Sequence, residues 1–370
     1  MYLLLMGAPA ARKSAAIGVG TGLLKAVRYK YLAPERMSRE AFLDELKLVN
    51  SPDLEEAGSL EALLDQMDSL EGKPSEFSVH AGEFVDFMGQ GDKDYLMLLT
   101  TLYDNLERYR SPKIARKTVE IYKPTVNLLG ASTPENLNMA FPANMMDTGT
   151  LSRFLFIYSN PTKEKVLIPS GCLDIAVEVE LIDKLEKIRA LKGTASLAPD
   201  AEELLQGIYE LAEPLKDPRF SFYSGRRLSH LIKLSIIQAA TRLSLTISAE
   251  DILIANTILC AAESRMPQAL GHFGISKNSQ TIHNMLQYIE ARPKLLTIND
   301  LYKIFSNDFT KQGDFQQVIQ DLVSAERISL YKKEKSVVVD VVKANIPKWA
   351  VDLMMPEVLT ESEREAIGLA

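Results

Sequence analysis

The feature that most constrains the fold is an apolar run followed at once by a glycine-bearing loop and a helix-forming stretch. Tyr2–Met6 is apolar and is typical of a buried strand, and the loop "MGAPAARKSAA" overlaps its end. Gly7, Lys13 and Ser14 match the glycine, lysine and hydroxyl of the phosphate-loop pattern G-x-x-x-x-G-K-[ST]. Strand, loop and helix in this order predict an α/β fold with a phosphate-binding loop.

One position of this loop departs from the pattern. Arg12 stands where the second glycine is expected, at a position that usually needs a permissive backbone. The arginine either forces a different loop path or adds a positive charge beside a bound phosphate. In such a loop the backbone N–H groups bind phosphate oxygens, while Lys13 would reach the β- and γ-phosphates and Ser14 would hold Mg²⁺. The expected contacts to ATP are Gly7, Ala8, Pro9, Ala10, Ala11, Arg12, Lys13, Ser14 and Ala15.

A second candidate stretch, "FSVHAGEFVDF", follows the alternating run Glu76–His80, which predicts a strand. Glu83 fits the carboxylate that polarises the attacking water and supports the metal. Gly82 occupies the place where a metal-supporting aspartate is usual, and Asp86 is a weaker candidate for that role. His80 is expected to be a hydrogen-bonded core histidine and not a ligand.

A third stretch, "NLLGASTPENL", is an apolar strand that ends in small hydroxyl residues. Ser132 or Thr133 at its tip is expected to contact the γ-phosphate. Thr133 followed by Pro134 and Glu135 is also good capping chemistry for a helix start. Both interpretations are compatible.

Two arginines are candidates for charge stabilisation. Arg153 precedes the apolar strand "FLFIYS", where it would project from the subunit edge toward the phosphates of a neighbouring chain. The alternative for Arg153 is a structural arginine paired with a core carboxylate. Arg226 begins a strong amphipathic helix together with Arg227, and a positive helix start favours a bound anion there. We expect Arg226 to fold back onto the phosphates, and the alternative is a solvated basic helix start.

Charge and composition limit the remaining possibilities. The chain has 370 residues, 42 Lys and Arg against 49 Asp and Glu, and a formal net charge of −7, which argues against nonspecific coating of DNA by the whole surface. Local basic segments remain, and the DNA contacts expected from them are Arg110, Lys113, Arg116 and Lys117 in a hairpin loop and Lys332 and Lys333 in a later turn. The two cysteines, Cys172 and Cys260, form no zinc motif and fit a reducing cytosol. No apolar run is long enough to span a membrane.

The pattern along the chain predicts three units and a tail. Strands alternate with helices over residues 1–170, which indicates a parallel sheet flanked by helices. Residues 171–275 show four helical segments and no strand pattern, and we expect an all-helical domain there. Residues 276–345 give three helices and then "ISLYKKEKSVVVDVV", two strands joined by a charged turn, which is a winged-helix pattern. Residues 346–370 are expected to form a peripheral tail.

Taken in order, these motifs resemble the AAA+ ATPase core of phage and prophage replication proteins of the primase-helicase type. The loop at Gly7–Ser14, "HAGEF", "LLGASTPENL" and "LSRFLFIY" occur in the order Walker A, Walker B, sensor 1 and arginine finger. The stretch "SGRRLSHLIKLSIIQAATRLSLTISAEDILIANTIL" is similar to the lid helices of minichromosome maintenance helicases, with Arg226 at the sensor 2 position. A winged helix after the lid is also a feature of that group.

The resemblance implies an ATP- and Mg²⁺-dependent helicase or translocase of DNA replication, working as a hexameric or other ring on single-stranded or duplex DNA. It also implies a cytoplasmic protein that works with a primase or another replisome component. An alternative is a helicase loader or initiator that uses ATP as an assembly switch. A third possibility is a scaffold in which Arg12 blocks the loop. Arg12 and Gly82 are the two departures that keep these alternatives open.

Overall fold

The computed structural model describes residues 1–49, 74–89, 91–111, 119–141, 149–159, 175–215, 217, 220, 223–270, 278–290, 296–309, 311–324, 328–333, 336–341 and 346–369. The apolar residues of Ser59–Leu70 have helical spacing and predict a helix, and this segment lies outside these ranges. Three of the expected DNA contacts, Lys113, Arg116 and Lys117, also lie outside them.

A four-stranded parallel sheet forms the centre of the first part of the chain. Its strands are β1 (Tyr2–Met6), β2 (Glu76–Ala81), β5 (Thr125–Ser132) and β6 (Phe154–Tyr158), in the order β2-β5-β1-β6. Alternate residues of β1 are buried and the others are half-buried, so neither face of this strand is open to solvent, which explains its continuous apolar run. The predicted parallel sheet is confirmed.

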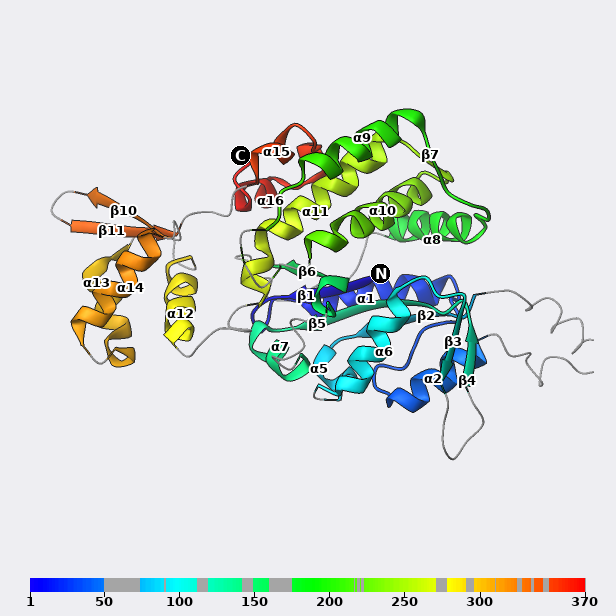
Figure 1. Cartoon of the computed structure of the whole chain (residues 1–370), viewed down its shortest axis with the longest axis horizontal. Helices are drawn as coiled ribbons and strands as arrows, with labels where there is room; N and C mark the ends of the chain where they lie inside the picture. The colour runs from blue at the N-terminus through cyan, green and yellow to red at the C-terminus, as the bar shows by residue number, and fades with distance from the viewer. Residues whose placement is uncertain are drawn as a thin grey trace, which may run out of the picture.

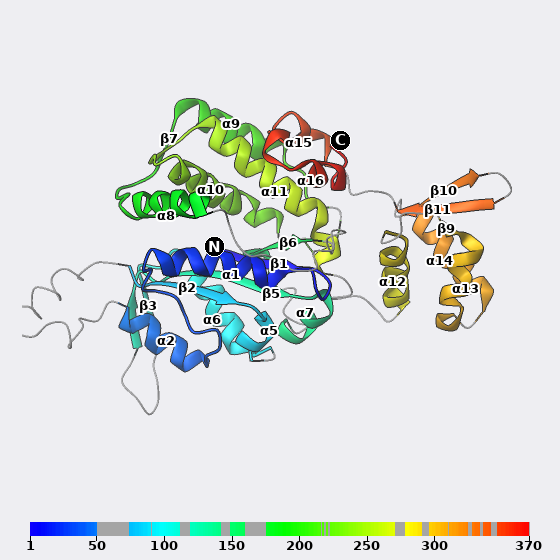
Figure 2. The ribbon, with the colours of Figure 1, turned by 180° about the vertical axis from the view of Figure 1, so that it is seen from behind.

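Helices cover both faces of this sheet. α1 (Lys13–Ala26) lies over one face and α6 (Lys93–Tyr103) over the other, as the opposite views in Figures 1 and 2 show. The apolar spacing of Asp92–Leu106 predicts a helix over that range, but α6 ends three residues earlier, because Asp104 adopts an extended conformation. The other helical elements of this part are α2 (Arg39–Leu48), α5 (Phe84–Phe87), α7 (Pro134–Ala140) and the 3-10 turn η2 (Leu151–Arg153).

A two-stranded antiparallel hairpin follows α6. It consists of β3 (Arg108–Ser111) and β4 (Val119–Tyr122), with Arg108 opposite Tyr122 and Ser111 opposite Val119. Val119 and Ile121 are buried against the core, whereas Arg108, Arg110 and Glu120 are exposed. The hairpin is therefore anchored to the core by its apolar side chains and exposes its polar side chains to solvent.

A layer of four helices lies along β6, the edge strand of the sheet (Figure 1). These helices are α8 (Ile175–Arg189), α9 (Pro199–Leu211), α10 (Ser224–Thr241) and α11 (Ala249–Leu270), and α11 contacts β6 directly. The expectation that this region holds no strand is wrong, because β7 (Ser196–Leu197) and β8 (Thr246–Ile247) form a short parallel pair. Each of these strands has only two residues, which is too few for an alternation of apolar and polar residues to be recognised in the sequence.

Residues 278–341 contain a separate hydrophobic core, which includes Leu301, Phe315 and Val339. Three helices and a hairpin surround this core, as predicted, and a short third strand joins the hairpin. The elements are α12 (Asn278–Glu290), β9 (Leu296–Thr297), α13 (Ile298–Phe305), the 3-10 turn η4 (Ser306–Asp308), α14 (Gln312–Ser324), β10 (Ile328–Lys333) and β11 (Ser336–Val341).

The C-terminal segment returns to the helical layer and packs on α11. Its elements are α15 (Lys348–Val351), the 3-10 turn η5 (Pro356–Val358) and α16 (Glu361–Ala366). Asn256 Nδ2 donates to the Leu353 carbonyl at 2.7 Å, and the Met355 N–H donates to Thr257 Oγ1 at 2.8 Å. Cys260 of α11 shares a small apolar cluster with this segment. The expected peripheral tail is thus docked on α11.

Candidate nucleotide site at the carboxyl edge of the sheet

The strand register brings three of the predicted motifs to one edge of the sheet. Met6, the last residue of β1, lies opposite Ser132, the last residue of β5. Ala81, the last residue of β2, lies opposite Gly130. The loop after β1, Glu83 after β2 and the Ser132–Thr133 tip of β5 therefore meet at the carboxyl edge, where open parallel sheets bind their ligands.

The loop after β1 reaches α1 through two residues in the left-handed region. Ala10 has φ 66°, and Arg12 has φ 55° and ψ 23° directly before the first residue of α1. Arg12 therefore adopts the conformation that a glycine would adopt here, at a cost of roughly 1–2 kcal/mol for a residue with a Cβ atom. Its side chain is exposed, which leaves the interior of the loop to backbone groups and Lys13.

Gly7, at the start of the loop, is fixed by the neighbouring strand. A Cβ atom at this position would lie 2.5 Å from the Ser159 carbonyl oxygen. Ser159 follows β6, and its N–H donates to the Met6 carbonyl at 2.9 Å. The backbone of the loop thus passes so close to the end of β6 that only glycine fits.

Lys13 lies inside the loop. Its Nζ donates to the carbonyls of Gly7 at 2.8 Å and Ala8 at 2.9 Å. Burial lowers the pKa of Lys13, and the negative charges of Glu83 and Glu135 act in the opposite direction. The ammonium group is therefore held by two carbonyls of the loop, and the charges of the two carboxylates favour its protonated form.

These two carboxylates come from different strands. Glu83 directly precedes α5 and is exposed, and it makes no capping hydrogen bond there. Glu135 lies in the first turn of α7 and is also exposed. The sequence interpretation missed Glu135, because "TPEN" accounts for it as helix-start chemistry alone. The signal was present in its position, three residues after the end of an apolar strand.

The donor set at this edge fits a phosphate with Mg²⁺. Lys13 and the loop N–H groups suit phosphate oxygens, while the Ser14 hydroxyl and the carboxylates of Glu83 and Glu135 are the hard oxygen ligands that Mg²⁺ prefers. The described residues contain no group of three or more His, Cys, Asp or Glu side chains arranged to hold a metal. Mg²⁺ bound with a nucleotide needs only one or two carboxylates, because phosphates and waters complete its shell.

Ser132 and Thr133 have different surroundings. Ser132 is buried, and its hydroxyl donates to the Thr133 carbonyl at 3.2 Å. The Thr133 hydroxyl accepts from the Asn136 N–H at 3.2 Å and caps α7, as the capping interpretation predicted. His80 is half-buried, with its Nδ1 2.8 Å from Thr21 Oγ1, and burial lowers its pKa. It is the hydrogen-bonded histidine that the sequence predicted.

Arg153 and Arg226 lie together at the opposite edge of the sheet. Arg153 directly precedes Phe154, which is opposite Tyr2 at the start of β1. The loop that holds Lys13 begins after Met6, about 13 Å further along that strand at 3.3 Å per residue. The structure therefore does not bring Arg226 to this loop of its own chain, contrary to the expectation from the sequence.

Asp104 binds both guanidinium groups. Its Oδ2 accepts from Arg153 at 2.8 Å and its Oδ1 accepts from Arg226 at 2.9 Å. Arg153 is buried and also donates to the Gly149 carbonyl at 3.0 Å. Within this chain it is therefore the structural arginine of the alternative interpretation, paired with a carboxylate, and its role toward a neighbouring chain stays a prediction.

A third cation joins this group, which we call the Asp104 cluster (Tyr103, Asp104, Arg153, Arg226 and Lys233). Lys233 Nζ lies 3.5 Å from the centroid of the Tyr103 ring, and both guanidinium groups lie within 6 Å of it. Burial alone would raise the pKa of Asp104, but hydrogen bonds and charges from the two arginines outweigh this effect and lower it. Burial and the same arginines lower the pKa of Lys233.

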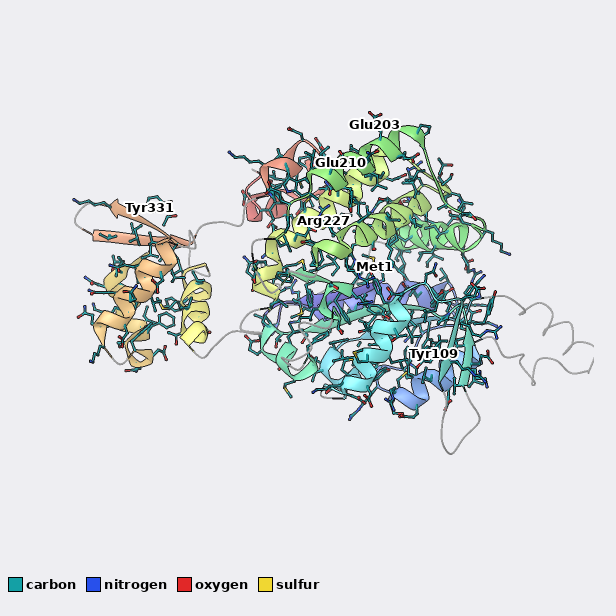
Figure 3. All side chains as sticks on the ribbon, in the orientation of Figure 1. Met1, Tyr109, Glu203, Glu210, Arg227 and Tyr331 are labelled. Carbon is teal, nitrogen blue, oxygen red and sulfur yellow. The ribbon has the colours of Figure 1, made fainter. Side chains whose placement is uncertain are left out.

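The β3–β4 hairpin holds part of the basic segment. Arg108 pairs with Glu120 at 2.8 Å and Lys123 with Glu107 at 3.7 Å, so two of the three described cations of this segment have acidic partners. Arg110 is exposed, and its neighbour Tyr109 is also on β3 (Figure 3). Among the described positions of this segment, Arg110 is the best placed for a phosphate contact.

The 278–341 unit carries its charges unevenly. Lys332 is exposed on β10 beside Tyr331, while Lys333 ends the strand. α14, the helix that a winged helix would place in a DNA groove, contains no Lys or Arg. Its exposed charged residues are Asp314 and Asp321, which repel phosphates.

No known protein-family profile matches this chain, and no curated protein is significantly similar to it. Among the described helices, none combines the length and apolarity that crossing a membrane requires. Any functional assignment must therefore rest on the geometry of the loop and its surroundings.

Proposed function

We propose that this chain is a P-loop ATPase of the AAA+ type that binds ATP with Mg²⁺ at the carboxyl edge of its sheet. The observation that carries the proposal is the loop between β1 and α1, where Arg12 takes a glycine-like conformation and Lys13 points into the loop. The register supports it as well, because the strand that ends in Ser132 terminates beside the loop.

The residues at this edge would bind the phosphates, hold the metal and orient the attacking water. Lys13 would exchange its two loop carbonyls for β- and γ-phosphate oxygens, and the Ser14 hydroxyl would hold the metal. Glu83 would orient the attacking water, and Ser132 or Thr133 would contact the γ-phosphate. Mg²⁺, when bound, would neutralise charge that develops on the phosphate oxygens.

Residues 1–170 would form the AAA+ core, 171–275 the lid, 276–345 a winged helix and 346–370 a tail. The chain would act as a DNA helicase or translocase in phage-type replication, as a hexameric or other ring in the cytoplasm, alongside a primase or another replisome protein. The hairpin with exposed Arg110 supports a contact with single-stranded or duplex DNA. In such a ring, Arg153 would need to leave Asp104 before it could reach a neighbouring nucleotide.

A helicase loader or initiator is the second candidate. Gly82 supplies no carboxylate after β2, and Asp104 holds both arginines away from any phosphate. Both features favour slow hydrolysis, which suits an assembly switch better than a motor. DNA unwinding by the purified chain with ATP would separate the motor from the loader.

The direct test is binding of mant-ATP, a fluorescent ATP analogue, to the full chain in the presence of Mg²⁺. We expect Lys13→Ala to abolish binding, because the loop loses its cation. Lys25→Ala is the matched control, since Lys25 is an exposed lysine in the last turn of the same helix, and it should bind as the wild type does. Equal binding by the Lys13→Ala variant and the wild type would refute the proposal.

A further inference from the structure

Glu135 lies in the first turn of α7, directly after the carboxyl end of β5. Thr133 caps this helix with a 3.2 Å hydrogen bond from the Asn136 N–H, and Pro134 is its first residue. These two residues fix the backbone direction in which Glu135 leaves β5. Because Ser132 lies opposite Met6, this first turn begins beside the loop that holds Lys13.

The helix starts that carry Glu83 and Glu135 belong to one packed unit. Phe84, the residue after Glu83, stacks on Phe141 at the end of α7, with ring centroids 5.6 Å apart. Phe84 also packs over β5, since its ring would lie 3.0 Å from a Cβ atom placed on Gly130. This aromatic contact therefore fixes α5 and α7 relative to each other. The charges of Glu83 and Glu135 both act to raise the pKa of Lys13, against the larger effect of burial.

The segment after β2 has no acid directly before Glu83, and Asp86, the weaker candidate for the metal-supporting role, lies three residues further on in α5 and is exposed. Gly82 stands at the position where an aspartate would support the metal, and a Cβ atom there would meet nothing within 4 Å. The position is therefore open, and no packing constraint of the described residues explains the glycine. A nucleotide-bound Mg²⁺ commonly uses one or two carboxylates, so the second one has to come from elsewhere if the centre uses two.

We propose that Glu135 supplies the carboxylate missing after β2 and positions the Mg²⁺ of the bound nucleotide together with Ser14 and Glu83. The inference rests on the proposed function, because it assigns a residue to the same nucleotide site. Glu135 would accept hydrogen bonds from metal-bound waters from the side of α7, as the aspartate does in the usual arrangement from the side of β2.

The test measures the Mg²⁺ concentration that half-saturates the fluorescence change of mant-ATP on the full chain. Glu135→Gln should raise this concentration at least tenfold, the scale on which second-shell partners affect metal affinity. In EDTA the same variant should bind mant-ATP at least as tightly as the wild type, because a negative charge facing the phosphates has been removed. A misfolded variant would bind more weakly under both conditions.

Two further variants make the test specific. Gly82→Asp in the Glu135→Gln background should restore the Mg²⁺ requirement to within about threefold of the wild type, a small fraction of the 10–100-fold effect of such partners. Asp200→Asn should leave it unchanged, since Asp200 follows Pro199 at the start of α9 as Glu135 follows Pro134 in α7. It removes an equivalent acid from a helix start elsewhere.

The possible failures are distinguishable. An unchanged Mg²⁺ requirement in Glu135→Gln, with Lys13→Ala still abolishing binding, would overturn the role of Glu135 and leave the nucleotide site intact. No binding of mant-ATP by the wild type at any Mg²⁺ concentration would overturn the proposed function and the role of Glu135 with it.

Discussion

Replacing Asp104 by asparagine keeps the shape of the side chain and removes the negative charge that Arg153 and Arg226 share. Exposed ion pairs contribute about 0–1 kcal/mol, and removing one partner of a buried pair costs about 3–5 kcal/mol. The side chains of Asp104, Arg226 and Arg153 are 45%, 31% and 10% exposed, which places these two ion pairs between the two limits. We expect a loss of about 2–3 kcal/mol in the free energy of unfolding.

Thermal melting followed by circular dichroism measures this loss. At about 2–4 °C per kcal/mol for a domain of 150–250 residues, the melting temperature should fall by roughly 5–10 °C at pH 7. The pKa of Asp104 is lowered in the folded chain, so its stabilisation is present above the unfolded value of about 3.9 and is lost as pH falls through the folded value. The difference between wild type and variant should therefore shrink below about pH 4.

A matched control is Asp183→Asn, which removes an exposed carboxylate paired with Lys187 at i+4 in α8. Its melting temperature should match that of the wild type within about 1 °C, because exposed helical pairs contribute only about 0.3–0.5 kcal/mol. If Asp104→Asn also melts within 1 °C of the wild type, or if the difference persists undiminished in acid, the charge argument for the Asp104 cluster is refuted.

Three other changes test the loop and the basic surfaces. Gly7→Ala should cost at least 1–3 kcal/mol in urea unfolding, because its Cβ atom would lie 2.5 Å from the Ser159 carbonyl oxygen, and a stability equal to the wild type would contradict the close approach. Arg12→Gly should be more stable than Arg12→Ala by about 1 kcal/mol in the same assay, since only the glycine relieves the left-handed strain, and the reverse order would contradict the backbone assignment. Arg110→Ala should lower the slope of log affinity for single-stranded DNA against log salt by about 0.7 in anisotropy titrations. Lys332→Ala should have the same effect if the β10–β11 hairpin contacts DNA. An unchanged slope would show that the substituted residue makes no contact with the DNA.

The sequence predicted the local parts of this fold well because their signals are local. The apolar run, the loop and the helix from Tyr2 to Ala26 are contiguous, and the strand order then places the predicted motifs at one edge. The pairing of Arg153 and Arg226 could not be predicted in the same way. Their partner, Asp104, lies 49 and 122 residues away along the chain, and its neighbours read only as the end of a helix.

Two other misses have physical reasons of the same kind. Arg12 could not be assigned to the left-handed region from the sequence, because only the closure of the loop between β1 and α1 imposes that conformation. Glu135 was explained by helix capping, which is a sufficient local reason for an acid in a first turn. Its proximity to Lys13 emerges only when β5 and β1 are paired in register.

The docking of the C-terminal segment changes how the 278–341 unit is connected. The chain leaves α11 at Leu270 and returns at Ile346, which packs against Cys260 of the same helix. The unit is thus a cassette inserted between α11 and the C-terminal segment that packs on α11, and a partner that pulls on it would load one helix at two points. That helix has 22 residues, about 33 Å of length, and it rests on β6. A force applied to the cassette would therefore be transmitted through α11 to β6, the edge strand of the sheet.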